Sequence, residues 1–142
     1  MAQPPNNPSV TNSRAVSPRV DNLDLVINVL FYHDSVWLKT DRAAMNRAVF
    51  AALAPGGVNG IVDHSAQAGA GVTQAETLHR IEQSVVQSEI EAAGFVPMKS
   101  GDFLSVPGDM RDWNASPRAA GDKRGQSDRF VLAFVKPNKG VR

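Results

Sequence analysis

The fold is decided by one apolar stretch, Leu23-Asp24-Leu25-Val26-Ile27-Asn28-Val29-Leu30-Phe31, which is rich in β-branched side chains. The run is too short for the core of a helix, and it contains no proline. A nearly continuous apolar run of this length is typical of a strand that is buried on both faces, as in a parallel sheet covered by helices. We therefore predict a strand from Leu23 to Phe31 in an α/β protein.

Helical and strand patterns alternate downstream of this stretch. Asp41 is a predicted helix N-cap, and Pro55-Gly56-Gly57 ends the helix that follows it. A second helix is predicted from about Thr73 to about Ala93. Further strands are predicted at residues 58–62, 95–104 and 130–135. This alternation predicts an α/β sandwich with right-handed crossovers.

The composition separates one domain from its ends. Residues 1–20 hold four prolines and three asparagines and few large apolar side chains, so we predict a flexible leader there. The predicted domain covers residues 21–137, with a polar, proline- and glycine-containing insertion at 105–127. Residues 138–142 form a short tail.

The residue content excludes several classes of protein. A hydrophobic fraction of 42% and a charged fraction of 20% are typical of a globular domain. The absence of cysteine excludes disulfides, thiolate catalysis and cysteine-ligated metal centres. Because no apolar run is long enough to cross a membrane and no secretory signal is present, we expect a cytoplasmic protein without a membrane partner.

Positive charge is concentrated near the C-terminus, where residues 111–142 hold eight basic and three acidic side chains. A basic segment can bind an anion or a nucleic acid. No aromatic side chains interleave with these charges as they do in single-strand binders, so we expect a solvated segment and no nucleic-acid partner. The basic residues are Arg111, Arg118, Lys123, Arg124, Arg129, Lys136, Lys139 and Arg142.

Polar side chains that can carry chemistry follow the first two predicted strands. The first strand is followed by Tyr32-His33-Asp34, and the second by Asp63-His64-Ser65. Ligands bind outside the carboxyl ends of parallel strands, and a carboxylate can orient a histidine that takes or gives a proton. We therefore predict a site at this edge with His33 and His64 as catalytic residues. His79 and Arg80, one to two turns into the next predicted helix, are expected to lean over the same edge.

Three other kinds of site are weighed and not favoured. The three histidines with Asp34 and Asp63 are a set of hard ligands, but no HxH or HExxH spacing supports a metal, so none is predicted. No serine lies in a GxSxG elbow, which argues against a Ser–His–Asp triad. Gly69-Ala70-Gly71 lacks the third glycine of a dinucleotide fingerprint, because position 74 is glutamine.

The order of these motifs is similar to that of a known family. Asp24–Val29, then Leu53-Ala54-Pro55-Gly56-Gly57-Val58, then Ile61-Val62-Asp63-His64 resembles the second half of a class I S-adenosylmethionine-dependent methyltransferase, and more narrowly a bacterial group of predicted methyltransferases. Glu91–Phe95 and Ser127–Leu132 fit the last helix and the final strand of that family. The resemblance covers about residues 21–137 and implies a partial Rossmann-like sheet. That sheet would hold strands four to seven of the family fold, in a three-layer sandwich that lacks the N-terminal half.

The resemblance also implies roles for individual residues. Asn28, Val29, Leu30 and Phe31 would line the S-adenosylmethionine site, and Tyr32, Asp63 and Arg80 would contact the substrate beside His33 and His64. The glycine-rich loop and the ribose-binding acidic residue of the family are absent from the sequence, and no glycine precedes Asp21.

We therefore expect a truncated methyltransferase domain that acts on a small-molecule acceptor. Its partner would be an N-terminal half, or a second copy bound through the strand Leu23–Phe31. The alternatives are a non-catalytic module that completes the sheet of another chain and, third, an anion- or nucleic-acid-binding domain. Whether this chain is an enzyme stays open at this point.

Overall fold

A computed structural model describes residues 20–139, so the predicted leader and the end of the tail lie outside the described residues. The elements confirm an α/β protein, and one helix, α1, was not predicted. They are β1 (Leu23–Val29), α1 (Tyr32–Trp37), α2 (Arg42–Ala52), β2 (Leu53–His64), α3 (Ala75–Leu78), α4 (Gln83–Ala92), β3 (Val96–Gly101), the 3-10 turn η1 (Gly121–Lys123) and β4 (Arg129–Val135).

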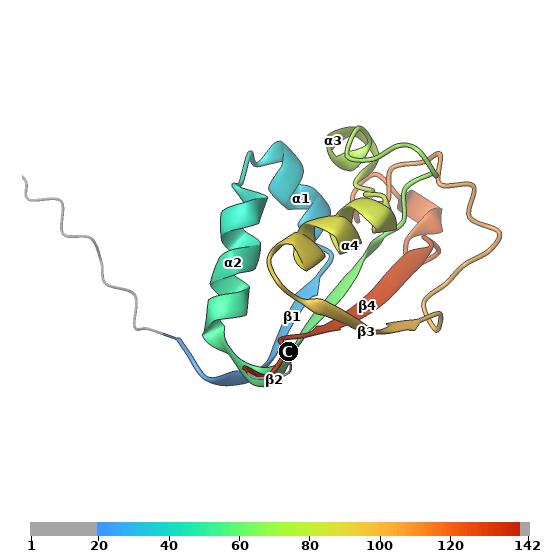
Figure 1. Cartoon of the computed structure of the whole chain (residues 1–142). Coiled ribbons are helices and arrows are strands. Elements are labelled where there is room, and N and C mark those ends of the chain that lie inside the picture. The colour runs from blue at the N-terminus through green and yellow to red at the C-terminus, as the bar shows by residue number, and fades with distance from the viewer. Residues whose placement is uncertain (1–19, 140–142) are drawn as a thin grey trace, which may run out of the picture.

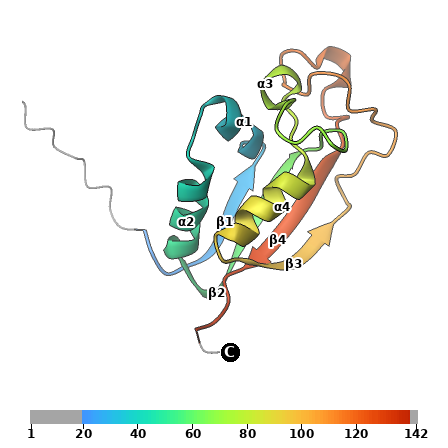
Figure 2. The same cartoon turned by 45° about the horizontal axis from the view of Figure 1, so that its top comes forward.

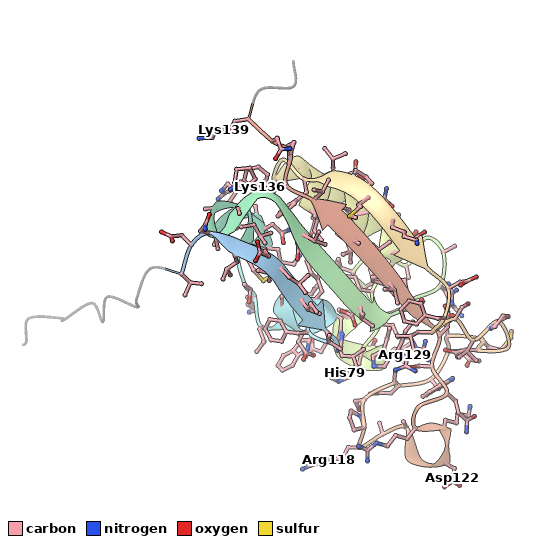
Figure 3. The ribbon with its side chains drawn as sticks, turned by 90° about the horizontal axis from the view of Figure 1, so that it is seen from below. His79, Arg118, Asp122, Arg129, Lys136 and Lys139 are labelled. Atoms are coloured by element: carbon pink, nitrogen blue, oxygen red, sulfur yellow. The ribbon has the colours of Figure 1, made fainter. Side chains whose placement is uncertain are left out.

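The four strands form one sheet in the order β1-β2-β4-β3. β1 and β2 run parallel, and β4 runs antiparallel to both β2 and β3. The helices lie on one face of the sheet, and the opposite face has no helix in front of it (Figures 1 and 3). The described part of the chain therefore has two layers, as expected of a three-layer sandwich without the elements of its other half.

The prediction that the first strand is buried on both faces is wrong. β1 is the edge strand, and the side chains of Leu25, Ile27 and Val29 on its open face are 52%, 59% and 55% exposed. Val26 on the opposite face packs against the core. The apolar composition is that of an interior strand, but nothing in residues 20–139 covers its second face.

The core lies between the helices and the covered face of the sheet. Phe134, Ile61 and Leu132 extend from the two central strands toward the helices, and Val86 and Ile90 of α4 are fully buried against them. The alternation of buried and half-buried residues along β4 is that of a strand with one covered face.

The first residues of β2, which follow α2 directly, have a steric requirement for glycine, and the predicted turn at Pro55-Gly56-Gly57 is an irregularity within this strand. Asp41 caps α2 by accepting a hydrogen bond from the amide of Ala44, as predicted. After the helix, a Cβ on Gly57 would lie 2.8 Å from the carbonyl oxygen of Ala54 and 2.9 Å from that of Leu23. The start of β1 therefore passes too close for any other residue at this position.

The single helix predicted from Thr73 to Ala93 is divided into α3 and α4. Between them His79 adopts a left-handed conformation with φ of 51°. Ile81 then forms a β-bridge with Ser65 and is fully buried. Burial of Ile81 beside the end of β2 is the physical reason for the break, because a continuous helix could not reach that strand.

The predicted insertion is tied to the body of the protein by a buried ion pair. Arg80, whose side chain is fully buried, donates to Asp109 at 2.9 Å and to the carbonyl oxygens of Ser65 and Trp113 at 3.0 Å each. Its guanidinium lies 4.7 Å from the centre of the Trp113 ring. The segment between β3 and β4 is therefore fixed from inside although it holds little regular structure.

The basic residues of the C-terminal part do not form one surface. Figure 3 places Lys136 and Lys139 at one end of the molecule and Arg118 at the other. Arg111 is paired with Asp128 at 2.7 Å. This spread gives no support to a nucleic-acid interface. Among residues 20–139 no helix has the length and apolar character that crossing a membrane requires.

Candidate functional site

The carboxyl ends of the parallel strands β1 and β2 meet beside α1 and α3 (Figure 2). α1 begins three residues after β1 and carries His33, while β2 ends in Asp63 and His64. The left-handed turn after α3 adds His79. The structure thus brings together all three histidines of the chain, with ring centres of His33 and its two neighbours 5.8 and 5.2 Å apart.

Asp63 holds His33 in place. Its carboxylate accepts a hydrogen bond from the backbone amide of His33 at 2.8 Å and lies 2.6 Å from Nδ1 of the same residue. It also accepts from the backbone amide of His64 at 2.7 Å. Because a carboxylate only accepts, Nδ1 of His33 carries the proton, and Nε2 of a neutral His33 presents a lone pair.

The free nitrogen of His33 faces a second carboxylate and a second imidazole. Nε2 lies 3.0 Å from Oδ1 of Asp34 and 3.2 Å from Nδ1 of His79. The side chains of Asp34 and His79 are about one quarter exposed, so this cluster is open to solvent on one side. Trp37 donates to Oδ1 of Asp34 at 3.0 Å and fixes that carboxylate.

His64 is buried next to Ser127, whose Oγ lies 2.7 Å from Nδ1 of the histidine. Burial lowers the pKa of His64 to about 4, against the opposing effect of the Asp63 charge. At neutral pH His64 is therefore uncharged, which is the form that can accept a proton.

The lowered pKa of His64 makes stability depend on pH. Between pH 6.5 and pH 4 the unfolded chain binds a proton at His64 that the folded chain does not, so the free energy of unfolding is expected to fall by about 2–3 kcal/mol as the pH drops through this range. Urea unfolding at half-unit pH steps measures this effect. His64→Asn keeps a polar atom near the Nδ1 position without titrating, and its stability should be flat over most of the same range. An equally steep fall in that variant would contradict the assignment.

The three predicted substrate contacts are all fully buried. Tyr32 donates its hydroxyl proton to Glu89 at 2.8 Å and accepts from Asn46, and burial raises its pKa. Asp63 orients the two histidines, and Arg80 holds the insertion. This placement argues against direct substrate contact by Tyr32, Asp63 or Arg80 and gives each a positioning or structural role.

Three of the four predicted cofactor residues line one side of an open groove, and Leu30 does not. A hollow of about 320 Å³ between β1 and α2 is lined by Asn28, Val29 and Phe31, with Asn46 and Met45 on the helix side. The side-chain oxygen of Asn28 is buried without a hydrogen-bond partner among residues 20–139. Leu30 adopts a left-handed conformation, with φ of 55°, where the chain turns from β1 into α1.

One contributor to the site was not predicted. Ser127 lies in the insertion, 63 residues away from His64 along the chain, and no local motif points to their contact. Asp34 was predicted at this edge of the sheet, but its approach to Nε2 of His33 was not, since the short helix α1 that carries it has no sequence signature.

Comparison with known proteins supports the fold. No family model and no curated protein matches the sequence. Among solved structures, the [4+2]-cyclase SpnF superposes with a TM-score of 0.57 at 17% identity, covering 86% of this chain and 53% of its own. A chain from the Haloferax volcanii complex that contains the Trm112 methyltransferase activator superposes with a TM-score of 0.53 at 14% identity. The match covers 86% of this chain and 57% of that one.

A third match is an S-adenosylmethionine-dependent methyltransferase from Mesorhizobium loti, with a TM-score of 0.50 at 17% identity. The match covers 82% of this chain and 63% of that one. The chain thus spans between half and two thirds of the length of these structures. Because the sequence identities are only 14–17%, these matches establish similarity of the fold alone. The sheet order, the parallel β1–β2 pair and the antiparallel β4 give this chain a partial Rossmann-like fold of the class I S-adenosylmethionine-dependent methyltransferase type.

Proposed function

We propose that this chain supplies the acceptor side of an S-adenosylmethionine-dependent methyltransferase that acts on a small molecule. The observation that carries the proposal is the convergence of His33, Asp63 and His64 at the carboxyl ends of β1 and β2, in a methyltransferase-like fold. In sheets of this class ligands bind at that edge. The remaining contacts to the cofactor would come from polypeptide outside these 142 residues.

The groove beside β1 fits part of the cofactor. Its volume of about 320 Å³ is at the lower end of the range for small-molecule sites. The unpartnered oxygen of Asn28 can accept a hydrogen bond from an amino group of S-adenosylmethionine. Val29 and Phe31, 55% and 43% exposed, offer apolar surface beside it.

Bound S-adenosylmethionine would supply a methyl group made electrophilic by its sulfonium. This chain would hold the acceptor in line with that group, and positioning would supply most of the rate. When the acceptor atom forms its bond to the methyl carbon, the carbon–sulfur bond breaks and the acceptor loses a proton. Neutral His64 is the proposed proton acceptor, with His33 as a second one.

The proposal predicts weak cofactor binding by the chain alone, because it supplies only one side of the site. Titration of the ¹⁵N-labelled chain with S-adenosylmethionine should shift the amide signals of residues 28–31, with a dissociation constant well above the low micromolar range, which corresponds to about −8 kcal/mol. Asn28→Ala should weaken the shifts, and Asn22→Ala, an exposed asparagine before β1, should leave them unchanged. Low-micromolar affinity would contradict the half-site, and shifts confined to other segments would contradict its location.

A second function is favoured by the open edge and face of β1. An edge strand with apolar side chains 52–59% exposed is a template for pairing with another chain. We infer that a non-catalytic role, in which this chain completes the sheet of a partner or of a second copy, is the main rival. The association experiment in the Discussion tests it.

A further inference from the structure

We propose that His33, Asp34 and His79 form a binding site for a first-row divalent transition-metal ion such as Zn²⁺. These residues belong to the larger ligand set that was considered from the sequence and not favoured, because their spacing matches no metal motif. The site is produced by the fold, since α1 carries two of the ligands and the left-handed turn after α3 carries the third.

The distances among the three donor atoms suit a single ion. His33 Nε2 and Asp34 Oδ1 are 3.0 Å apart, His33 Nε2 and His79 Nδ1 are 3.2 Å apart, and His79 Nδ1 and Asp34 Oδ1 are 3.6 Å apart. An ion with bonds of about 2.0–2.1 Å in tetrahedral geometry holds its donor atoms about 3.3–3.4 Å from one another. The three observed distances, 3.0, 3.2 and 3.6 Å, lie on both sides of these values, so the separations of the donor atoms already suit an ion.

The surroundings orient the ligands as in known metal sites. Asp63 accepts a hydrogen bond from Nδ1 of His33 at 2.6 Å, which turns the Nε2 lone pair toward the cluster. A metal-bound histidine almost always donates its other nitrogen to a carboxylate or carbonyl in this way. Asp63 is fully buried, so this orientation is fixed by the body of the protein.

The chemistry of the donors selects the class of ion. Two imidazole nitrogens and one carboxylate oxygen suit Zn²⁺, Fe²⁺ or Co²⁺, whereas Mg²⁺ and Ca²⁺ prefer oxygen ligands. The ligands come from one side only, and Asp34 and His79 are partly exposed, so at least one coordination position faces solvent. An additional proton on His33 would satisfy the same three atoms, and it is the competing explanation.

The metal site and the proposed methyl transfer share His33 but can be tested separately. With an ion bound, Nε2 of His33 is a ligand, and His64 is the imidazole left to accept a proton. Metal binding can be measured without S-adenosylmethionine, so the failure of one proposal is distinguishable from that of the other.

The test is calorimetric titration of the full chain with Zn²⁺, accompanied by the visible spectrum with Co²⁺. We expect one ion per chain. His79→Asn keeps a residue that tolerates the left-handed conformation, and Asp34→Asn keeps the shape of the side chain. Each should weaken Zn²⁺ binding by roughly 10- to 100-fold, the range seen when a supporting group of a metal site is removed, or by more. Asp41→Asn, the same change at the exposed N-cap of α2, should leave the affinity unchanged.

A second measurement keeps the proposal falsifiable if a variant fails to fold, which far-UV circular dichroism would reveal. X-ray absorption of the Zn²⁺-loaded chain should show two imidazole ligands with further oxygen or nitrogen ligands at about 2.0–2.2 Å. Absence of saturable one-to-one binding, an affinity that His79→Asn leaves unchanged, or fewer than two imidazoles at the zinc would overturn the proposal.

Discussion

Replacing Arg80 with alanine is expected to lower the free energy of unfolding by about 3–5 kcal/mol. The Arg80 side chain is fully buried, and its partner Asp109 is 1% exposed, so the variant would leave a buried carboxylate without its counter-charge. Burial opposes ionisation of Asp109, but hydrogen bonds from the backbone and from Arg80 hold its pKa below the usual value. The carbonyl oxygens of Ser65 and Trp113 would also lose their donor.

Chemical denaturation at neutral pH measures this loss, and the chain offers a matched control. Arg118 belongs to the same insertion and is exposed, so Arg118→Ala should change stability by less than about 0.5 kcal/mol. Arg80→Lys retains the positive charge but not the planar set of guanidinium donors. Its loss of stability should lie between those of Arg80→Ala and Arg118→Ala. Comparable stability of Arg80→Ala and Arg118→Ala would show that the insertion is not held by this ion pair.

Self-association through β1 is the second large expected effect. The backbone of β1 is paired on one side only, and Leu25, Ile27 and Val29 are exposed on its open face. We expect the chain to form a dimer or soluble aggregate at tens of micromolar in the absence of a partner that covers this strand. Lysine on an exposed edge discourages pairing, so Val29→Lys should raise the dissociation constant of the dimer more than tenfold.

Sedimentation velocity across a concentration series, carried out on the chain and its variants, distinguishes association through β1 from non-specific aggregation. Leu38, the C-cap residue of α1, is 49% exposed and is not part of β1, and Leu38→Lys should leave association unchanged. A monomer that persists at tens of micromolar and unfolds cooperatively would refute association through β1. It would also remove the main support for the rival function, completion of another sheet.

The order of the four strands and the position of α2 were readable from the sequence because they depend on local patterns. The apolar run at residues 23–29 and the cap at Asp41 specify backbone conformation within a few residues. The same holds for the expectation that His33, Asp63 and His64 would meet, because parallel strands carry their carboxyl ends to one edge.

Features that depend on distant contacts were not readable. The break at His79 follows from the burial of Ile81 beside Ser65, and no glycine or proline marks it. The burial of Arg80 depends on Asp109 in the insertion, 29 residues later. Arg80 was therefore predicted to contact the substrate, whereas in the structure its guanidinium forms an ion pair with Asp109.

The parallel register of β1 and β2 sets the geometry of the site from a distance. Val29 is paired with Val62, and this pairing alone places the amide of His33 within reach of the Asp63 carboxylate. A slip of one residue would reverse the facing of every side chain in β1 relative to β2. The irregular start of β2, where Gly57 lies against the carbonyl oxygen of Leu23 at the opposite end of the sheet, therefore sets the register that reaches the histidine cluster. The number of residues between Leu53 and Val58 is under the same constraint as the site residues themselves.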